Sequence, residues 1–138
     1  MKNAIDFVRF ALSHAKRESI PLGAELPLDI EECGTEPWEY LFGTTGVVVT
    51  QELLDRRFDS FYKKKGWNRT SYDIATTNWA AKHVKVCDCQ GLLDYYLGTD
   101  VNSNYCYSAW CTEKGSIDDV ERGYRLGEAV FYRNPDGR

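Results

Sequence analysis

Histidine, the usual proton-transfer residue of thiol and hydroxyl enzymes, is nearly missing from this sequence. The 138 residues hold only His14 and His83. Because an imidazole is the usual partner of a nucleophilic side chain, few catalytic pairings are open to the chain. Proline is also scarce, and three of the four prolines fall between Ser19 and Pro37. That stretch is therefore predicted to be mainly loop.

Long apolar runs are absent as well. No run approaches the ~20 residues that a membrane-spanning helix needs, so no membrane span is expected. The first 15 residues carry Asp6, Arg9 and His14 in the only apolar region that could serve as a signal peptide, which argues against one. The formal net charge of -4 argues against a nucleic-acid-binding protein.

Five cysteines are present, an odd number that does not suit a complete disulfide framework. Cys87 and Cys89 are too close for the usual zinc spacing, and Cys106 and Cys111 have no histidine nearby. The sequence therefore predicts reduced thiols, no metal site and no cofactor.

Helical periodicity and capping residues predict several helices. Asn3 is expected to cap a helix through about residue 16, and Thr50 a helix that ends by Gly66. The polar segment Trp67–Thr77 is expected to be irregular. Further predictions are a helix from Cys89 to Gly98, a helix at about 104–112, an extended run at 47–49, a strand at 128–132 and a turn at 134–137.

Cys89 stands where an apolar lead-in gives way to the predicted helix. The first amides of a helix have no internal acceptors and the helix dipole is positive there, so a thiolate is favoured. Placement alone does not decide its role, because most cysteines are ordinary buried thiols.

Three segments, taken in order, give the chain a specific resemblance. Asp88-Cys89-Gln90-Gly91-Leu92-Leu93 resembles the Asp-Cys-Ser-Gly-Leu segment of NlpC-type cysteine peptidases, the papain-like bacterial cell-wall hydrolases. The segment 38–46 is similar to the Tyr-x-x-Gly element that precedes that cysteine, with a spacing most like that of phage endolysins. The segment 126–132 is similar to the Gly-Asp-Leu-Val-Phe strand that leads to the family's catalytic histidine.

The resemblance implies an α+β, papain-like fold with a helical N-terminal lobe and a small antiparallel sheet. It implies one peptidase domain over residues 1–138. The family's histidine would follow Arg138, so the resemblance implies a chain truncated at its C-terminus. The remainder, or a neighbouring chain, would then complete the sheet.

The resemblance also implies roles for four residues. Cys89 would be the nucleophile, and the Tyr40 hydroxyl would help to hold the oxyanion, unless Tyr40 is simply a packed aromatic. Asp88 and Gln90 would contact the substrate, although Asp88 could instead cap the helix. Gln90 replaces the family's serine. His14 is expected to be structural, and His83 too, although a pairing of His83 with Cys89 stays open.

Two functions follow from these interpretations. In the first, the chain is the N-terminal part of a cysteine endopeptidase that cleaves peptidoglycan stem peptides. In the second, it is a catalytically inactive wall-binding or assembly module. Either protein would be made in the cytoplasm and would reach the cell wall only after release by a holin-type or element-associated system.

Overall fold

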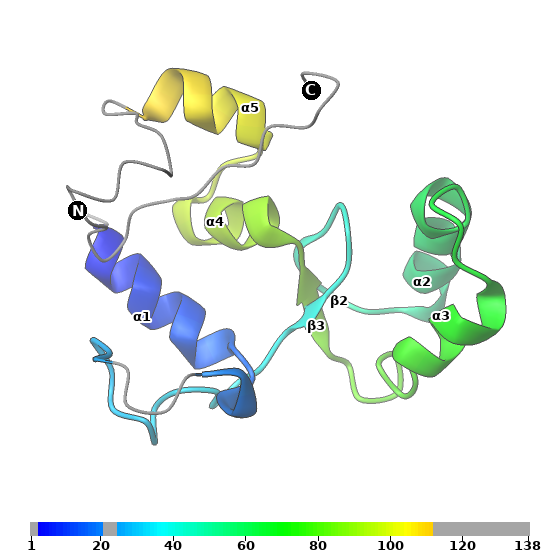
Figure 1. Cartoon of the computed structure of the whole chain (residues 1–138), viewed down its shortest axis with the longest axis horizontal. Helices are drawn as coiled ribbons and strands as arrows, with labels where there is room; N and C mark the ends of the chain where they lie inside the picture. The colour runs from blue at the N-terminus through cyan, green and yellow to red at the C-terminus, as the bar shows by residue number, and fades with distance from the viewer. Residues whose placement is uncertain (1–2, 21–24, 112–138) are drawn as a thin grey trace.

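The computed structural model describes residues 3–20 and 25–111, and it shows a three-stranded sheet with helices on both sides (Figure 1). In chain order the described elements are α1 (Ala4–His14), the 3-10 turn η1 (Arg17–Ser19), β1 (Glu39–Tyr40), β2 (Thr45–Val48), α2 (Gln51–Arg57), its π-helical continuation η2 (Phe58–Tyr62), α3 (Arg69–Ala75), β3 (Lys85–Cys87), α4 (Cys89–Leu97), α5 (Ser103–Tyr105) and its π-helical continuation η3 (Cys106–Trp110).

The sheet is mixed, with the strand order β1-β3-β2. β3 runs parallel to β1 and antiparallel to β2. The α+β class is thus confirmed, whereas the antiparallel pairing expected from the sequence is present between β2 and β3 and is wrong for β1 and β3. The reason is the long connection from β1 to β3, which carries β2, α2 and α3 and lets β3 return in the direction of β1. The predicted strand at 128–132 lies outside the described residues.

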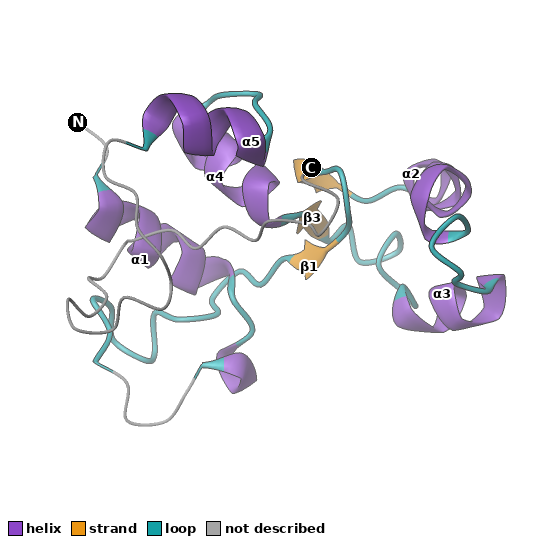
Figure 2. Cartoon of the chain, turned by 45° about the horizontal axis from the view of Figure 1, so that its top comes forward, coloured by secondary structure: helices purple, strands orange, loops and turns teal. Residues whose placement is uncertain are grey.

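Helices flank the sheet on two sides (Figure 2). α1, α4 and α5 lie on one side, and α2 and α3 lie on the other. The main core sits between the sheet and the second group. Its buried members are Leu41, Val49, Leu53, Leu54, Phe58, Tyr72 and Val86. The Tyr72 hydroxyl donates to the Leu54 carbonyl oxygen at 2.7 Å, so this phenol is buried with its polar atom satisfied.

The capping predictions are confirmed at three helix starts. Asn3, Thr50 and Asp88 each accept a hydrogen bond from an amide three residues later. Gly98 ends α4 in the left-handed conformation, with φ of 71°. These ends were predictable because a cap depends on neighbours within one helical turn.

The prediction that Trp67–Thr77 is irregular is wrong, because α3 lies there. Asn68 caps it by accepting from the Ser71 amide at 2.8 Å, and Arg69 pairs with Asp73 across one turn. Only Tyr72 of this helix is buried. A single buried side chain gives no recognisable apolar stripe, so periodicity could not reveal the helix.

The helix predicted at about 104–112 is present slightly earlier. α5 and η3 run together from Ser103 to Trp110, and Asn102 caps the start by accepting from the Tyr105 amide at 2.9 Å. The turn predicted at 134–137 lies outside the described residues.

Candidate active site

Cys89 is the first residue of α4, directly after the turn that ends β3. Its side chain is exposed, and Asp88 before it has the extended backbone of a helix cap, with φ of -95° and ψ of -177°. The amides of Cys89 and Gln90 fall in the first helical turn, where the helix offers no acceptor. An acyl oxygen next to the thiol would therefore meet an unpaired backbone donor at the positive end of the helix dipole.

Asp88 uses both carboxylate oxygens on backbone amides. One accepts from the Gly91 amide at 2.6 Å, within α4, and the other accepts from the Gly43 amide at 2.8 Å, in the loop between β1 and β2. The Asp88 amide in turn donates to the Thr44 carbonyl oxygen at 3.0 Å. The capping role considered for Asp88 is therefore observed. The residue also ties the loop of Gly43 and Thr44 to the helix that carries Cys89.

Gly91 is required at this junction, and sequence reasoning missed it. A Cβ added there would lie 1.9 Å from the Thr44 carbonyl oxygen, far inside the contact distance of any real side chain. Only glycine lets α4 approach the loop this closely. The available signal was a glycine in the first turn of a helix, where a residue of better helix propensity would ordinarily be expected.

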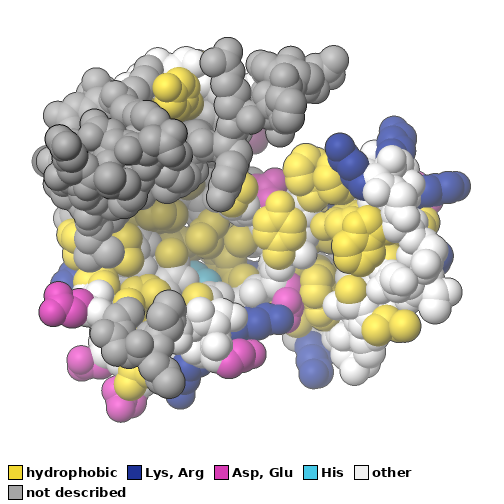
Figure 3. All heavy atoms as spheres, in the orientation of Figure 1, with side chains coloured by type: hydrophobic (Ala, Val, Ile, Leu, Met, Phe, Trp, Pro, Cys, Tyr) yellow, Lys and Arg dark blue, Asp and Glu magenta, His cyan; other side chains and the backbone are white. Residues whose placement is uncertain are grey.

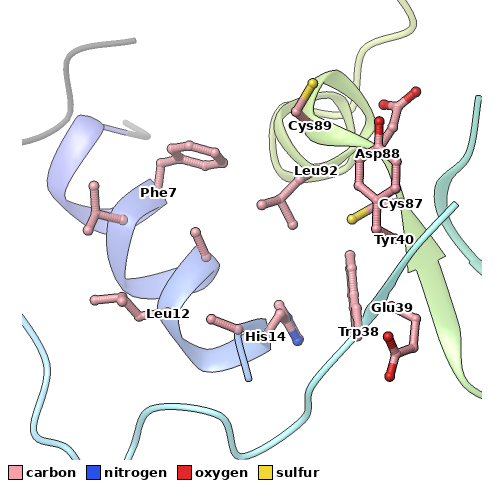
Figure 4. A pocket seen from close by; sticks show the side chains of 13 residues that line it. Phe7, Leu12, His14, Trp38, Glu39, Tyr40, Cys87, Asp88, Cys89 and Leu92 are labelled. Atoms are coloured by element: carbon pink, nitrogen blue, oxygen red, sulfur yellow. The ribbon is translucent and has the colours of Figure 1, made fainter. Parts of the chain in front are cut away.

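Tyr40 lies beside the start of α4 because of the sheet register. It is the β1 partner of Cys87 in β3, two residues before Cys89. Figure 4 shows its hydroxyl end beside Asp88, at the Cys89 end of the cavity. Partial burial and the negative charges of Cys89 and Asp88 raise the pKa of this phenol. The hydroxyl thus keeps its proton at neutral pH and is available as a hydrogen-bond donor.

Gln90 is directed along its own helix. Its side-chain amide donates to an Asp94 carboxylate oxygen at 3.3 Å. Asp94 is buried, and it also accepts from the Thr99 hydroxyl at 2.7 Å and from the Val101 amide at 3.3 Å. The contacts of Gln90 thus support the end of α4, and substrate contact by this residue stays a prediction.

A cavity of about 420 Å³ lies between α1 and the junction of β1, β3 and α4 (Figure 4). Cys89 and Tyr40 line one end, where the Cys89 sulfur points away from His14 at the other end. The lining is largely apolar, so the cavity suits a chain with small apolar side chains. The lining residues are Phe7, Val8, Ala11, Leu12, His14, Ala15, Trp38, Glu39, Tyr40, Cys87, Asp88, Cys89 and Leu92.

Neither histidine of the chain forms a hydrogen bond with Cys89. The His14 Nδ1 atom lies 2.7 Å from the Glu36 carbonyl oxygen, and its ring stacks on Trp38 with centroids 4.1 Å apart. His83 is exposed and precedes β3, whereas Cys89 follows it. β3 (Lys85–Cys87) therefore separates the two residues along the chain. The structure does not assemble a cysteine–histidine pair from these residues.

All five cysteines lie within the described residues, and none forms a disulfide. Within the ranges 3–20 and 25–111, no group of three or more histidine, cysteine, aspartate or glutamate side chains is arranged to hold a metal ion. In the same ranges, no helix has the length and apolar character to cross a bilayer.

Alkylation should distinguish Cys89 from the other thiols. Cys33 and Cys106 are buried, and burial raises the pKa of Cys106. Burial, with the charges of Asp88 and Cys89, raises the pKa of Cys87 to about 11. At pH 7.5, iodoacetamide followed by peptide mapping should therefore label Cys89 before the other four cysteines. Labelling of Cys89 at the rate of Cys111 or slower would count against a nucleophilic role.

Comparisons with known proteins found no match for this chain. No family model, no curated protein and no solved structure matches the chain.

Proposed function

We propose that this chain carries the nucleophile and the oxyanion donors of a papain-like cysteine endopeptidase that cleaves peptidoglycan stem peptides. The observation that supports this most strongly is the junction of β3 and α4. An exposed cysteine begins the helix there, a tyrosine hydroxyl lies nearby on β1, and an apolar cavity opens beside both. The substrate class rests on the NlpC-like motifs at 38–46 and 88–93.

The reaction begins when the Cys89 thiolate attacks the carbonyl carbon of the scissile peptide bond. A carbon–sulfur bond forms, and the carbonyl π electrons move to the oxygen. The Cys89 amide and the Tyr40 hydroxyl donate hydrogen bonds to that oxyanion. The carbon–nitrogen bond then breaks, and the leaving amine takes a proton from an imidazolium. Water hydrolyses the resulting thioester and regenerates the thiol.

Asp88 has a positioning role in this scheme. Because its two oxygens accept from the Gly43 and Gly91 amides, it ties the loop that directly follows Tyr40 to the helix that carries Cys89. An oxyanion site needs hydrogen-bond donors at about 2.7–3.1 Å from the oxygen that becomes negatively charged. The hydrogen bonds of Asp88 therefore hold the Cys89 amide and the Tyr40 hydroxyl in a fixed relative position.

The imidazole of this scheme comes from outside the 138 residues, in a further segment or a neighbouring chain. His14 is engaged by Glu36 and Trp38, and His83 lies at the opposite end of β3 from the thiol. A thiol without such a base is a slow nucleophile at neutral pH.

One observation favours a second function, that of a catalytically inactive wall-binding or assembly module. Neither imidazole of the chain forms a hydrogen bond with Cys89, yet a largely apolar pocket lies beside this thiol. Native protein purified from its source, incubated with purified peptidoglycan, distinguishes the two functions. Release of stem-peptide fragments that stops in Cys89→Ala supports the peptidase, whereas binding without release supports the module.

Replacement of Tyr40 by phenylalanine tests the oxyanion role. The ring is 58% exposed, so loss of its hydroxyl should leave the melting temperature nearly unchanged. Loss of one oxyanion donor should lower kcat of the native enzyme by about ten- to a thousandfold. Steady-state kinetics on a soluble muropeptide would measure this. A variant with normal kcat and a lowered melting temperature would show that Tyr40 serves in packing instead.

A further inference from the structure

Two stacked phenylalanines lie near the candidate site, Phe42 in the loop between β1 and β2 and Phe61 in η2. The rings of Phe42 and Phe61, called here the aromatic platform, have centroids 3.8 Å apart and planes within 9° of parallel. Phe42 remains 40% exposed despite this contact. Figure 3 shows hydrophobic side chains gathered on the half of the molecule that carries α2 and α3, with lysine and arginine side chains at its edge. Contiguous exposed apolar surface rimmed by polar residues marks sites of ligand or protein contact.

The platform is held rigidly from beneath. The Phe42 amide donates to the Tyr62 hydroxyl at 3.0 Å, and the Phe61 ring meets the Tyr62 ring edge-on at 5.1 Å. Tyr62 packs in turn against buried Tyr72, with centroids 5.1 Å apart. A ligand would therefore meet a surface that needs no ordering when it binds.

The platform is close to the candidate nucleophile. Phe42 is bonded to Gly43, whose amide donates to Asp88 at 2.8 Å, and Asp88 is bonded to Cys89. Standard backbone and side-chain dimensions then place the Phe42 and Cys89 Cα atoms at most roughly 13 Å apart. One substrate molecule can therefore reach both.

Cations accompany the aromatic rings. A Cβ at Gly43 would lie 2.8 Å from Arg57 Nη1, so the guanidinium covers that backbone. Among the described residues, no carboxylate lies within 4 Å of the Arg57 side-chain nitrogens. Lys65 Nζ lies 5.7 Å from the Phe61 ring centroid, and Lys63 and Lys64 are exposed beside it. The chain has a net charge of -4, so this local excess of cations favours an anionic ligand.

We infer that the aromatic platform binds a sugar ring of the glycan that carries the stem peptide, and that Arg57 binds a carboxylate of that peptide. A pyranose presents a face of C–H groups, which packs on the electron-rich face of an aromatic ring. A guanidinium is the side chain best matched to a carboxylate. This inference rests on the proposed function, because the sugar and the carboxylate belong to the same peptidoglycan substrate as the scissile peptide bond.

The test compares two soluble probes by calorimetry with the full chain. The first is a disaccharide-tetrapeptide released from peptidoglycan, and the second is the same tetrapeptide without sugar. We expect the wild-type chain to bind the sugar-bearing probe at least tenfold more tightly. Phe42→Leu and Phe61→Leu, which keep apolar volume but remove the aromatic face, should abolish that preference. Tyr105→Leu, at an aromatic residue 53% exposed on α5, is the matched control and should keep it.

A second variant tests the charge contact. Arg57→Gln should weaken binding of the disaccharide-tetrapeptide at least fivefold and leave binding of a neutral N-acetylglucosamine oligomer unchanged. Saturation-transfer NMR on the wild-type chain should show transfer to the sugar-ring protons, and it needs no variant that must fold. Absence of that transfer overturns the inference. An equal loss of affinity for both probes in the Phe42 variant also overturns it, because the platform would then bind the peptide.

Failure of this inference is distinguishable from failure of the proposed function. If the sugar preference is lost in the platform variants while no Cys89-dependent cleavage is found, the platform inference stands and the peptidase proposal falls. If cleavage depends on Cys89 while the platform variants bind both probes as the wild type does, the peptidase stands and the platform inference falls.

Discussion

Gly91→Ala is expected to lower the free energy of unfolding by about 3 kcal/mol or more, the upper end of the cost of overpacking a tight contact. The new Cβ would stand 1.9 Å from the Thr44 carbonyl oxygen and 3.0 Å from the Asp88 oxygen that caps α4. Displacing either the backbone carbonyl of the loop or the capping carboxylate would cost folding free energy. Either α4 withdraws from the loop or the hydrogen bonds of Asp88 break.

Thermal unfolding followed by circular dichroism measures this, and a fall of roughly 10 °C is expected for a domain of this size. Gly98→Ala is the matched control on the same helix. It meets no atom within 4 Å and changes only a left-handed residue, with φ of 71°. Its cost should be about 1–2 kcal/mol. If Gly91→Ala melts no lower than Gly98→Ala, the close approach of α4 to Thr44 is not real.

The second large effect expected is that the 138-residue chain by itself has no peptidase activity. Cys89 lacks an imidazole partner, so the chain alone should release no stem peptide from purified peptidoglycan above the rate of Cys89→Ala. Turbidity and chromatography of soluble fragments measure this. His83→Ala and His14→Ala should make no difference.

One result would reverse this conclusion. If the 138-residue chain clears peptidoglycan and His83→Ala abolishes that activity, His83 is the base and the segment before β3 moves to reach Cys89. If instead His14→Ala abolishes it, the base acts from the far end of the cavity. Either result would leave the proposed cysteine peptidase activity in place and would change only which residue acts as the base.

The candidate site was predictable in part. Cys89 was placed at a helix start from its local sequence, and the structure has it as the first residue of α4. The capping role of Asp88 is observed, because its Oδ1 atom accepts a hydrogen bond from the Gly91 amide, and substrate contact by Asp88 stays a prediction. The need for glycine at position 91 was not predictable, because it depends on how closely the loop of Thr44 packs against α4.

The sequence by itself determined the features that depend on neighbours within one turn. The helix starts after Asn3, Thr50 and Asp88, and the helix end at Gly98, follow from hydrogen bonds between residues three to five apart and from the left-handed freedom of glycine. Such bonds join residues that are close in sequence, and for that reason a local pattern predicts them.

Only the tertiary structure decided which distant segments meet. The parallel register of β1 and β3 brings Tyr40 opposite Cys87, and Asp88 reaches Gly43 across 45 positions of sequence. α3 forms against the core through Tyr72 although its sequence is mostly polar. These contacts close long loops, so each is stable only when the others have formed. No window of sequence contains both partners, which is why the neighbours of Cys89 emerged only from the fold.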